Sequence, residues 1–253
     1  MKGYFEPPYR NGLRAELLDL AQRDARICGA AITGSAAMDR EDRWSDIDLA
    51  FGLTDRGAVD AVIADFTQFM RESHGALHHL DVRAGAWTYR VFFLPGGLQV
   101  DLAFVEESEF RPLGETFRIV FGEAKALSPF PEPAPIDLIG MAWLHALHAR
   151  TCILRGKLWQ AEFMISGLRD HVLALACIRL GLPAAHGRGM DQLPRPITDP
   201  LLGSLVGDLN PDGLRRALGV VVRALESEIR EVDAALADRI GGELELLASA
   251  ATL

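Results

Sequence analysis

The hydrophobic pattern of this chain changes at one place, the proline-rich stretch Ser128-Pro-Phe-Pro-Glu-Pro-Ala-Pro135. Its four prolines cannot continue a helix or a central strand, because proline lacks a backbone N–H and has a fixed φ. Before this stretch many apolar residues occur in short strand-like runs, and after it they recur at helical spacing over long segments. The chain is therefore predicted to be α+β, with a small mixed β-sheet domain and flanking helices over residues 1–128, a linker over 129–135 and a helical bundle over 136–253.

The individual elements are predicted from the same periodicities. In the first domain, amphipathic helices are expected over residues 12–27 and 57–73. Short apolar or alternating runs predict strands over 28–33, 46–53, 78–83, 87–94 and 98–105, with a Gly96-Gly97 hairpin turn between the last two. Past the linker, helices are expected over 136–156, 158–181, 211–236 and 239–251, with a loop over 181–194.

Composition limits the partners that this chain is expected to have. Of its 253 residues, 49% are hydrophobic and 24% charged, which is ordinary for a globular protein with a sizeable core. The net charge of −9 argues against binding to DNA or to an anionic membrane and is compatible with a cationic substrate. The three cysteines are scattered, so neither a disulfide framework nor a zinc cluster is expected. With no secretory signal and no apolar run long enough to span a bilayer, we expect a cytoplasmic protein.

Two aspartates, Asp46 and Asp48, stand one residue apart at the start of the apolar run DIDLAFGL. On a strand, residues i and i+2 face the same way, so both carboxylates share one face while Ile47 and Leu49 point into the core. Like charges placed together cost stability unless a cation lies between them. The pair therefore predicts a site for a hard divalent cation with oxygen ligands.

A third carboxylate, Asp101, lies between apolar residues on the strand expected over 98–105. If that strand lies beside the strand of Asp46 and Asp48, the three aspartates could hold two magnesium ions roughly 3.5–4 Å apart, as in sites for in-line phosphoryl chemistry. Asp81, on the strand expected over 78–83, is a rival third acid, but the apolar neighbours of Asp101 match those of the first pair better.

A glycine-serine pair, Gly34-Ser35, precedes Asp46 with ten residues between them. Glycine at a strand end lets a ligand approach the backbone closely, and serine offers its amide and hydroxyl to phosphate oxygens. If a short helix starts after Ser35, its N-terminus would add a partial positive charge. The pair therefore predicts a phosphate-binding turn.

The combination of Gly34-Ser35, the ten-residue spacing, Asp46-Ile47-Asp48 and Asp101 resembles the nucleotidyltransferases related to DNA polymerase β. The motif covers roughly residues 28–105. Within that superfamily, a short catalytic domain followed by a helical bundle is similar to the antibiotic nucleotidyltransferases of the aminoglycoside and lincosamide type. The motif identifies the nucleotide chemistry and leaves the acceptor open.

The resemblance implies a magnesium-dependent transfer of a nucleoside monophosphate, usually AMP from ATP, to a hydroxyl of a small molecule, with release of pyrophosphate. Asp46 and Asp48 would hold the magnesium on the triphosphate, and Asp101 would join them on the second ion and help to deprotonate the acceptor. Gly34 and Ser35 would bind the β- and γ-phosphates. Residues 1–128 would then be the catalytic domain, and the bundle would serve acceptor binding or dimerisation.

In several antibiotic-modifying relatives, a carboxylate of the helical half is the general base. Glu162 is the best candidate here, because it lies among apolar neighbours on an expected helix, so the base stays open between Asp101 and Glu162. Lys157, five residues earlier, is expected to reach a phosphate. Such relatives are often dimers, which leaves a homodimer open. The cluster Glu106-Glu107-Ser-Glu109 either binds a cationic acceptor or is an exposed loop.

Two other functions remain as alternatives. The same motif spacing occurs in antitoxin-type enzymes that adenylylate a protein or RNA partner, although these are typically shorter and lack a second half of this size. A non-catalytic nucleotide-binding or scaffold protein is the other alternative. Degenerate members of the superfamily usually lose one of the acids, and all three are present here.

Overall fold

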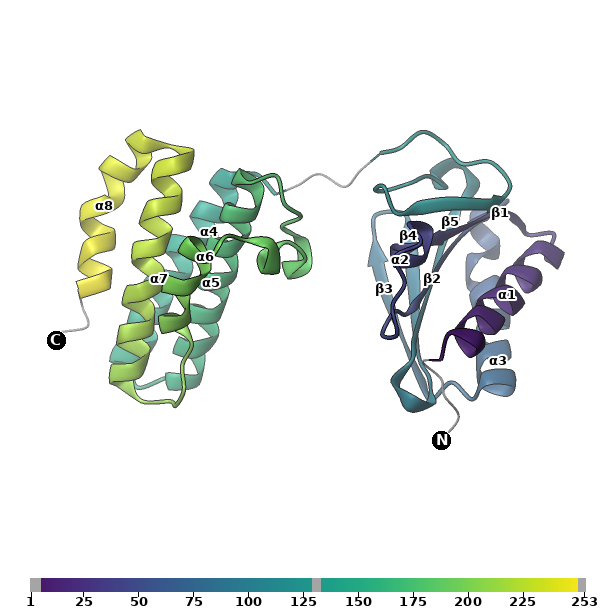
Figure 1. Cartoon of the computed structure of the whole chain (residues 1–253), viewed down its shortest axis with the longest axis horizontal. Helices are drawn as coiled ribbons and strands as arrows, with labels where there is room; N and C mark the ends of the chain where they lie inside the picture. The colour runs from purple at the N-terminus through teal and green to yellow at the C-terminus, as the bar shows by residue number, and fades with distance from the viewer. Residues whose placement is uncertain (1–5, 129–132, 250–253) are drawn as a thin grey trace. The chain divides into compact units, whose positions relative to one another are not determined.

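The computed structural model describes residues 6–128 and 133–249 of this chain (Figure 1). The chain divides into two compact units, Met1–Phe130 and Pro131–Leu253, and each is described by itself. Of the expected linker, residues 129–132 lie outside the described part. Pro135 does not belong to a linker, because it opens helix α4, where a proline in the first turn leaves no further N–H unsatisfied.

The first unit is built on a mixed six-stranded sheet with the order β3-β4-β5-β2-β1-β6. Its strands are β1 (Ile27–Thr33), β2 (Ile47–Leu53), β3 (His78–Ala84), β4 (Trp87–Phe93), β5 (Gln99–Glu106) and β6 (Phe117–Phe121). The central pair β2–β5 is parallel, and the other neighbours are antiparallel. The edge strand β6 was not predicted, because its largely exposed residues show no clean alternation and its pairing with β1 is distant in sequence.

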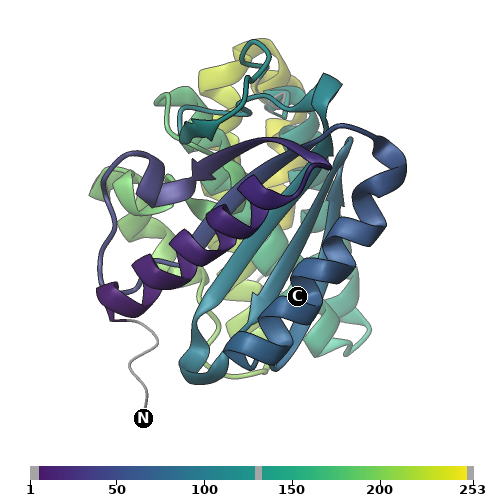
Figure 2. The same cartoon turned by 90° about the vertical axis from the view of Figure 1, so that its right-hand side faces the viewer.

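Two helices, α1 (Pro7–Arg23) and α3 (Val59–His74), cover one face of this sheet (Figure 2). Their core contains Leu17, Phe51, Phe66 and Phe104, all at most 1% exposed. The expected range 12–27 for the first helix was wrong at both ends. The helix begins at Pro7, where proline suits the first turn, and it ends before Asp24, whose carboxylate accepts a hydrogen bond from the backbone N–H of Arg26.

The opposite face of the sheet is built from small residues and one aromatic ring. Ala31, Ala50 and Ala103 are buried there in a cluster with Trp87 and Phe110. The Phe110 ring also lies over two paired glycines, Gly29 of β1 and Gly52 of β2. A Cβ at either glycine would come within 2.7 Å of the ring, so only glycine lets the ring approach the strands this closely.

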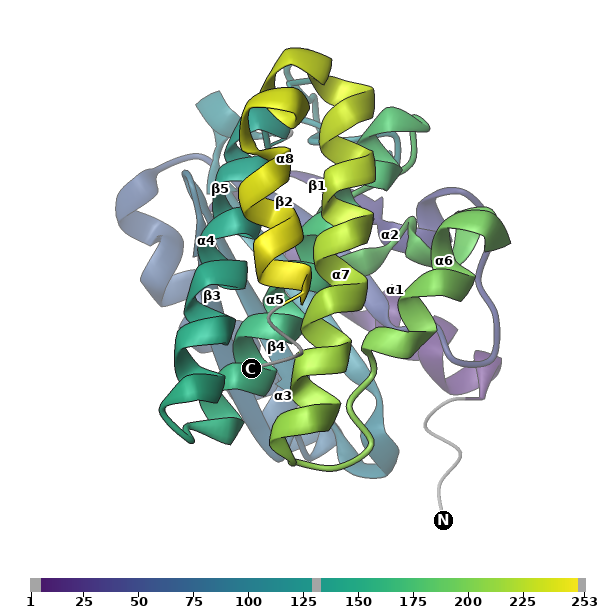
Figure 3. The same ribbon diagram turned by 90° about the vertical axis from the view of Figure 1, so that its left-hand side faces the viewer.

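The second unit is helical (Figure 3). Its helices are α4 (Pro135–Leu154), α5 (Leu158–Arg179), α6 (Arg195–Leu201), α7 (Pro211–Val232) and α8 (Ala234–Ser249). The expected continuous helix over 211–236 breaks at Asp233, whose carboxylate caps α8 by accepting a hydrogen bond of 2.9 Å from the backbone N–H of Leu236. The short α6 was not predicted, because Pro196 and Pro200 interrupt its pattern.

The predicted α+β fold class is confirmed: a mixed sheet with flanking helices is followed by a helical region. The end of the fourth expected helix, over residues 250–251, lies outside the described residues. Among the described helices, none combines the length and the apolar character that crossing a membrane requires.

The packing of Phe110 on the glycine pair gives a stability prediction. Gly52→Ala places a methyl group against Phe110 and should lower the free energy of unfolding by about 1–3 kcal/mol. Gly114→Ala is the matched control, since a Cβ there meets nothing within 4 Å, and it should have little effect. Thermal and denaturant unfolding measure both, and equal stability of the two variants would contradict this account of the packing.

Candidate metal centre

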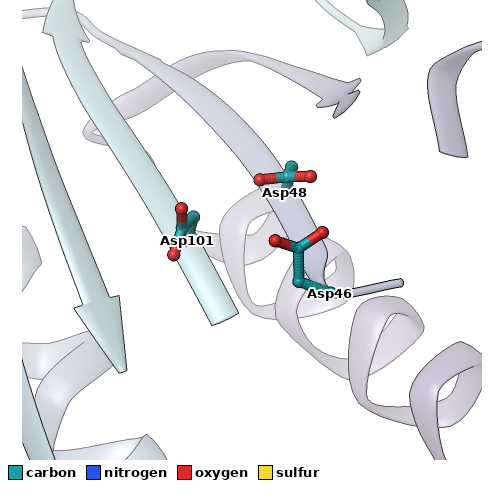
Figure 4. A group of neighbouring side chains, drawn as sticks. All are labelled: Asp46, Asp48 and Asp101. Atoms are coloured by element: carbon teal, nitrogen blue, oxygen red, sulfur yellow. The ribbon is translucent and has the colours of Figure 1, made fainter. Parts of the chain in front are cut away.

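Three aspartates meet at the start of the parallel pair β2–β5 (Figure 4). The register pairs Asp48 directly with Asp101, and Asp46 lies two residues before Asp48 on the same side. One carboxylate oxygen from each of the three lies within 4.8 Å of those of the other two. The neighbouring residues Ile47 and Leu49 point to the helix-covered face and are buried. The alternation expected from the sequence therefore places all three acids on the face that α1 and α3 leave uncovered.

The charges of this cluster are only partly solvated, since all three aspartates are half-buried. Burial raises the pKa of Asp101 to about 6, the Gln99 side chain opposes this, and the negative charge of Asp46 adds to it. The Gln99 amide donates to both Asp101 oxygens, at 3.1 and 3.2 Å. The cluster therefore favours a bound proton or cation over three bare carboxylates.

The donor set fits a hard divalent cation. The carboxylates of Asp48 on β2, Asp101 on β5 and Asp46 just before β2 supply only oxygen ligands, the type that Mg²⁺ and Mn²⁺ prefer. No histidine or cysteine takes part in this group, which does not favour a softer metal. Within the described residues, it is the one group of three or more potential ligands close enough to hold an ion.

Gly34 lies against this cluster. It has a positive φ of 64°, and a Cβ at this position would overlap the carboxylate of Asp48. Both the backbone conformation and the close approach therefore require glycine. Gly34 and the half-buried Ser35 begin α2 (Gly34–Ala37), a single turn that aligns few peptide dipoles. Gly34 is thus adjacent to Asp48, and phosphate binding by the glycine-serine pair stays a prediction.

The rival acid Asp81 belongs to the other face of the sheet. Its carboxylate is paired with Arg90 at 2.7 Å, and Arg90 also donates to the Thr67 hydroxyl of α3 at 2.6 Å. The Arg90 guanidinium holds the pKa of Asp81 below its usual range. Asp81 is therefore an ion-pair partner beneath a helix, and Asp101 is the third acid of the cluster.

Glu162 and Lys157 lie in the second unit. Glu162 is half-buried on α5, and its carboxylate accepts a hydrogen bond of 2.6 Å from the Ser166 hydroxyl. Ser166 in turn accepts from the Arg169 guanidinium at 2.9 Å. Lys157 is exposed and directly precedes α5. The roles of both residues stay predictions, because they belong to a different compact unit from the acids.

Arg10, which bonds to the loop before Asp46, was not predicted from the sequence. Arg10 of α1 is buried and donates hydrogen bonds to the loop that leads into Asp46. It shares the buried stripe of its helix with Leu13, Leu17 and Ala21. An arginine on an otherwise apolar stripe indicates a buried, hydrogen-bonded side chain. The sequence does not identify its partners, because the residues that Arg10 bonds to are at least 32 residues away.

Comparisons with known proteins add little to this geometry. No protein-family model matches the sequence, and no curated protein matches it. Among solved structures, an aminoglycoside 6-adenyltransferase from Bacillus subtilis is similar at 12% identity, over 91% of this chain and 95% of that chain, with a TM-score of 0.43. A likeness this weak does not assign the chain to a family.

The contact between Gly34 and Asp48 gives a mutational prediction. Gly34→Ala should displace the Asp48 carboxylate and lower Mn²⁺ affinity at least about tenfold. Gly75→Ala is the matched control, because Gly75 has a similar φ of 65° and a Cβ there meets nothing within 4 Å. Both variants carry the strain of a positive φ, so equal Mn²⁺ affinity in the two would contradict the assigned contact.

The raised pKa of Asp101 predicts a pH dependence of the metal-free protein. Folding strengthens proton binding by this group, so its contribution to stability is present below about pH 4 and is lost as the pH rises through about 6. Asparagine cannot lose a proton, so it does not acquire this penalty. In EDTA, the melting temperature of Asp101→Asn minus that of the wild type should therefore increase as the pH is raised from 4 to 7. A difference that stays constant with pH would contradict the assignment.

Proposed function

We propose that this chain is a magnesium-dependent nucleotidyltransferase, which transfers AMP from ATP to a hydroxyl of a small molecule and releases pyrophosphate. The observation that carries the proposal is the three-aspartate cluster on the sheet face opposite α1 and α3, with Gly34 against it. Neither the core nor the sheet pairing needs three acids there, whereas a metal-bound triphosphate does.

The residues of the cluster would have separate roles in metal binding and phosphate binding. Asp46, Asp48 and Asp101 would hold magnesium, which when bound neutralises the charge of the triphosphate and of the leaving pyrophosphate. Gly34 leaves room for the Asp48 carboxylate, and the Ser35 amide and hydroxyl would donate to the β- and γ-phosphates. The acceptor oxygen bonds to the α-phosphorus, the bond to the β-phosphate breaks, and a carboxylate takes the hydroxyl proton.

The base in this proposal is Asp101 or Glu162. Asp101 is a candidate because it belongs to the cluster that would hold the metal-bound triphosphate. Glu162 has a fixed orientation through its hydrogen bond to Ser166. Lys157 would bind the triphosphate, because its charged side chain is exposed just before α5.

The acceptor is proposed to be an aminoglycoside or lincosamide hydroxyl, bound with the help of the helical unit. The net charge of −9 suits a cationic acceptor and does not suit DNA. A cytoplasmic location, where ATP and magnesium are abundant, and a homodimer that shares its sites complete the proposal.

A compound panel tests the proposed reaction. The protein is incubated with magnesium, each nucleoside triphosphate in turn and a panel of hydroxylated antibiotics, and the products are weighed by mass spectrometry. We expect one acceptor class to gain the mass of a nucleoside monophosphate, with ATP as the best donor. Asp46→Asn, Asp48→Asn and Asp101→Asn should each lower the rate more than about 100-fold, since changes that merely disturb metal ligands cost 10–100-fold.

The control is Asp60→Asn, which removes an exposed aspartate of α3 in the same unit and should leave the rate unchanged. If no compound gains mass while a co-purified protein or RNA does, the acceptor is a macromolecule and the small-molecule proposal is wrong. Full activity in Asp46→Asn would exclude the cluster as the catalytic centre.

A further inference from the structure

Among the residues that the structure describes, Arg10 is the most deeply buried charged residue, at 3% exposure. Its Nη1 donates to two backbone carbonyls of one loop, Asp42 O at 2.8 Å and Ser45 O at 3.1 Å. Ser45 directly precedes Asp46 in the chain. A helix that packs against the sheet thus reaches, through one side chain, the backbone next to a candidate metal ligand.

The loop between α2 and β2 is attached near its beginning by Asp39, which pairs with Arg118 of β6 at 2.8 Å. Its last residues bond mainly to one another: Asp42 N–H donates to Ser45 Oγ at 2.9 Å, and Trp44 N–H donates to Asp42 Oδ1 at 2.8 Å. These bonds shape a tight turn but do not fix the turn to the sheet. The two bonds from Arg10 join this turn to α1.

A charged partner holds Arg10 in place. Glu41 Oε1 forms an ion pair with Arg10 Nε at 3.1 Å, without hydrogen-bond geometry, and it accepts a hydrogen bond from Arg14, one helical turn further along α1. Two arginines of α1 therefore face one glutamate of the loop that leads to β2. A buried guanidinium with these partners has little freedom to move.

We propose that Arg10 is a positioning residue, which sets the direction of the Asp46 carboxylate by holding the carbonyls of Asp42 and Ser45. The inference rests on the proposed metal function of the cluster and adds a residue that no motif of the sequence contains. Groups that orient metal ligands typically change metal affinity 10–100-fold when they are removed.

The test compares Arg10→Lys and Arg10→Gln with Arg23→Gln, using Mn²⁺ alone as the probe. Lysine keeps the charge beside Glu41 but is too short to reach both carbonyls as a guanidinium does. Arg23 is the matched control, because it is an exposed arginine of the same helix that pairs only with Asp19, 2.7 Å away, among the contacts of the described residues. Titration calorimetry measures Mn²⁺ affinity, and hydrogen exchange follows the amides of residues 41–46.

The proposal predicts that Arg10→Lys weakens Mn²⁺ binding at least about tenfold and speeds exchange of the loop amides, while Arg23→Gln changes neither. Arg10→Lys that binds Mn²⁺ within twofold of the wild type would overturn it. If Arg10→Gln fails to fold, the lysine variant decides the outcome. Exchange of the wild-type Asp42 and Trp44 amides at the rate of an unstructured peptide would also overturn the proposal, without any variant.

Failure of the metal function looks different from failure of this inference. If the wild type binds no Mn²⁺, or if Asp46→Asn binds it equally well, the cluster is not a metal site and both proposals fall. If the wild type binds Mn²⁺ in an Asp46-dependent way and Arg10→Lys does the same, only the role of Arg10 is refuted.

Discussion

The parallel pairing of β2 with β5 is the constraint on which the candidate site depends. It places Asp48 opposite Asp101, and the strand period of two then determines the direction of every other residue in the pair. A slip of one residue would turn Asp101 into the helix-covered core and bring Val100 or Leu102 onto the uncovered face. Since Val100, Leu102 and Phe104 are all at most 1% exposed in that core, apolar packing holds the register of the acids.

The same arrangement brings three negatively charged side chains close together, which lowers the stability of the first unit. Three half-buried carboxylates repel one another, and the pKa of Asp101 rises because burial disfavours its charge. The surrounding structure nonetheless keeps them close. The core fixes the strand register, Gly34 leaves space for the Asp48 carboxylate, and Arg10 donates hydrogen bonds to the loop before Asp46. A cation would relieve the repulsion that these contacts maintain, so binding and stability should be linked.

Much of this could be predicted from the sequence, because local patterns determine it. Alternation alone put Asp46 and Asp48 on one face, and apolar flanks favoured Asp101 over Asp81. Features that depend on contacts between distant residues could not be predicted. β6 is a strand because it pairs with β1, and Arg10 donates hydrogen bonds to a loop more than 30 residues away. The role predicted for Glu162 is still open, since its hydrogen bond to Ser166 is local to α5 and does not test that role.

Anomalous diffraction from crystals grown with Mn²⁺ and a non-hydrolysable ATP analogue tests the central claim most directly. The claim is that the three aspartates at the start of β2 and β5 form a metal centre for nucleotide transfer. It predicts anomalous peaks within ligand distance of Asp46, Asp48 and Asp101, with the triphosphate lying against Gly34 and Ser35. Manganese bound elsewhere, or a triphosphate remote from the glycine-serine turn, would contradict it.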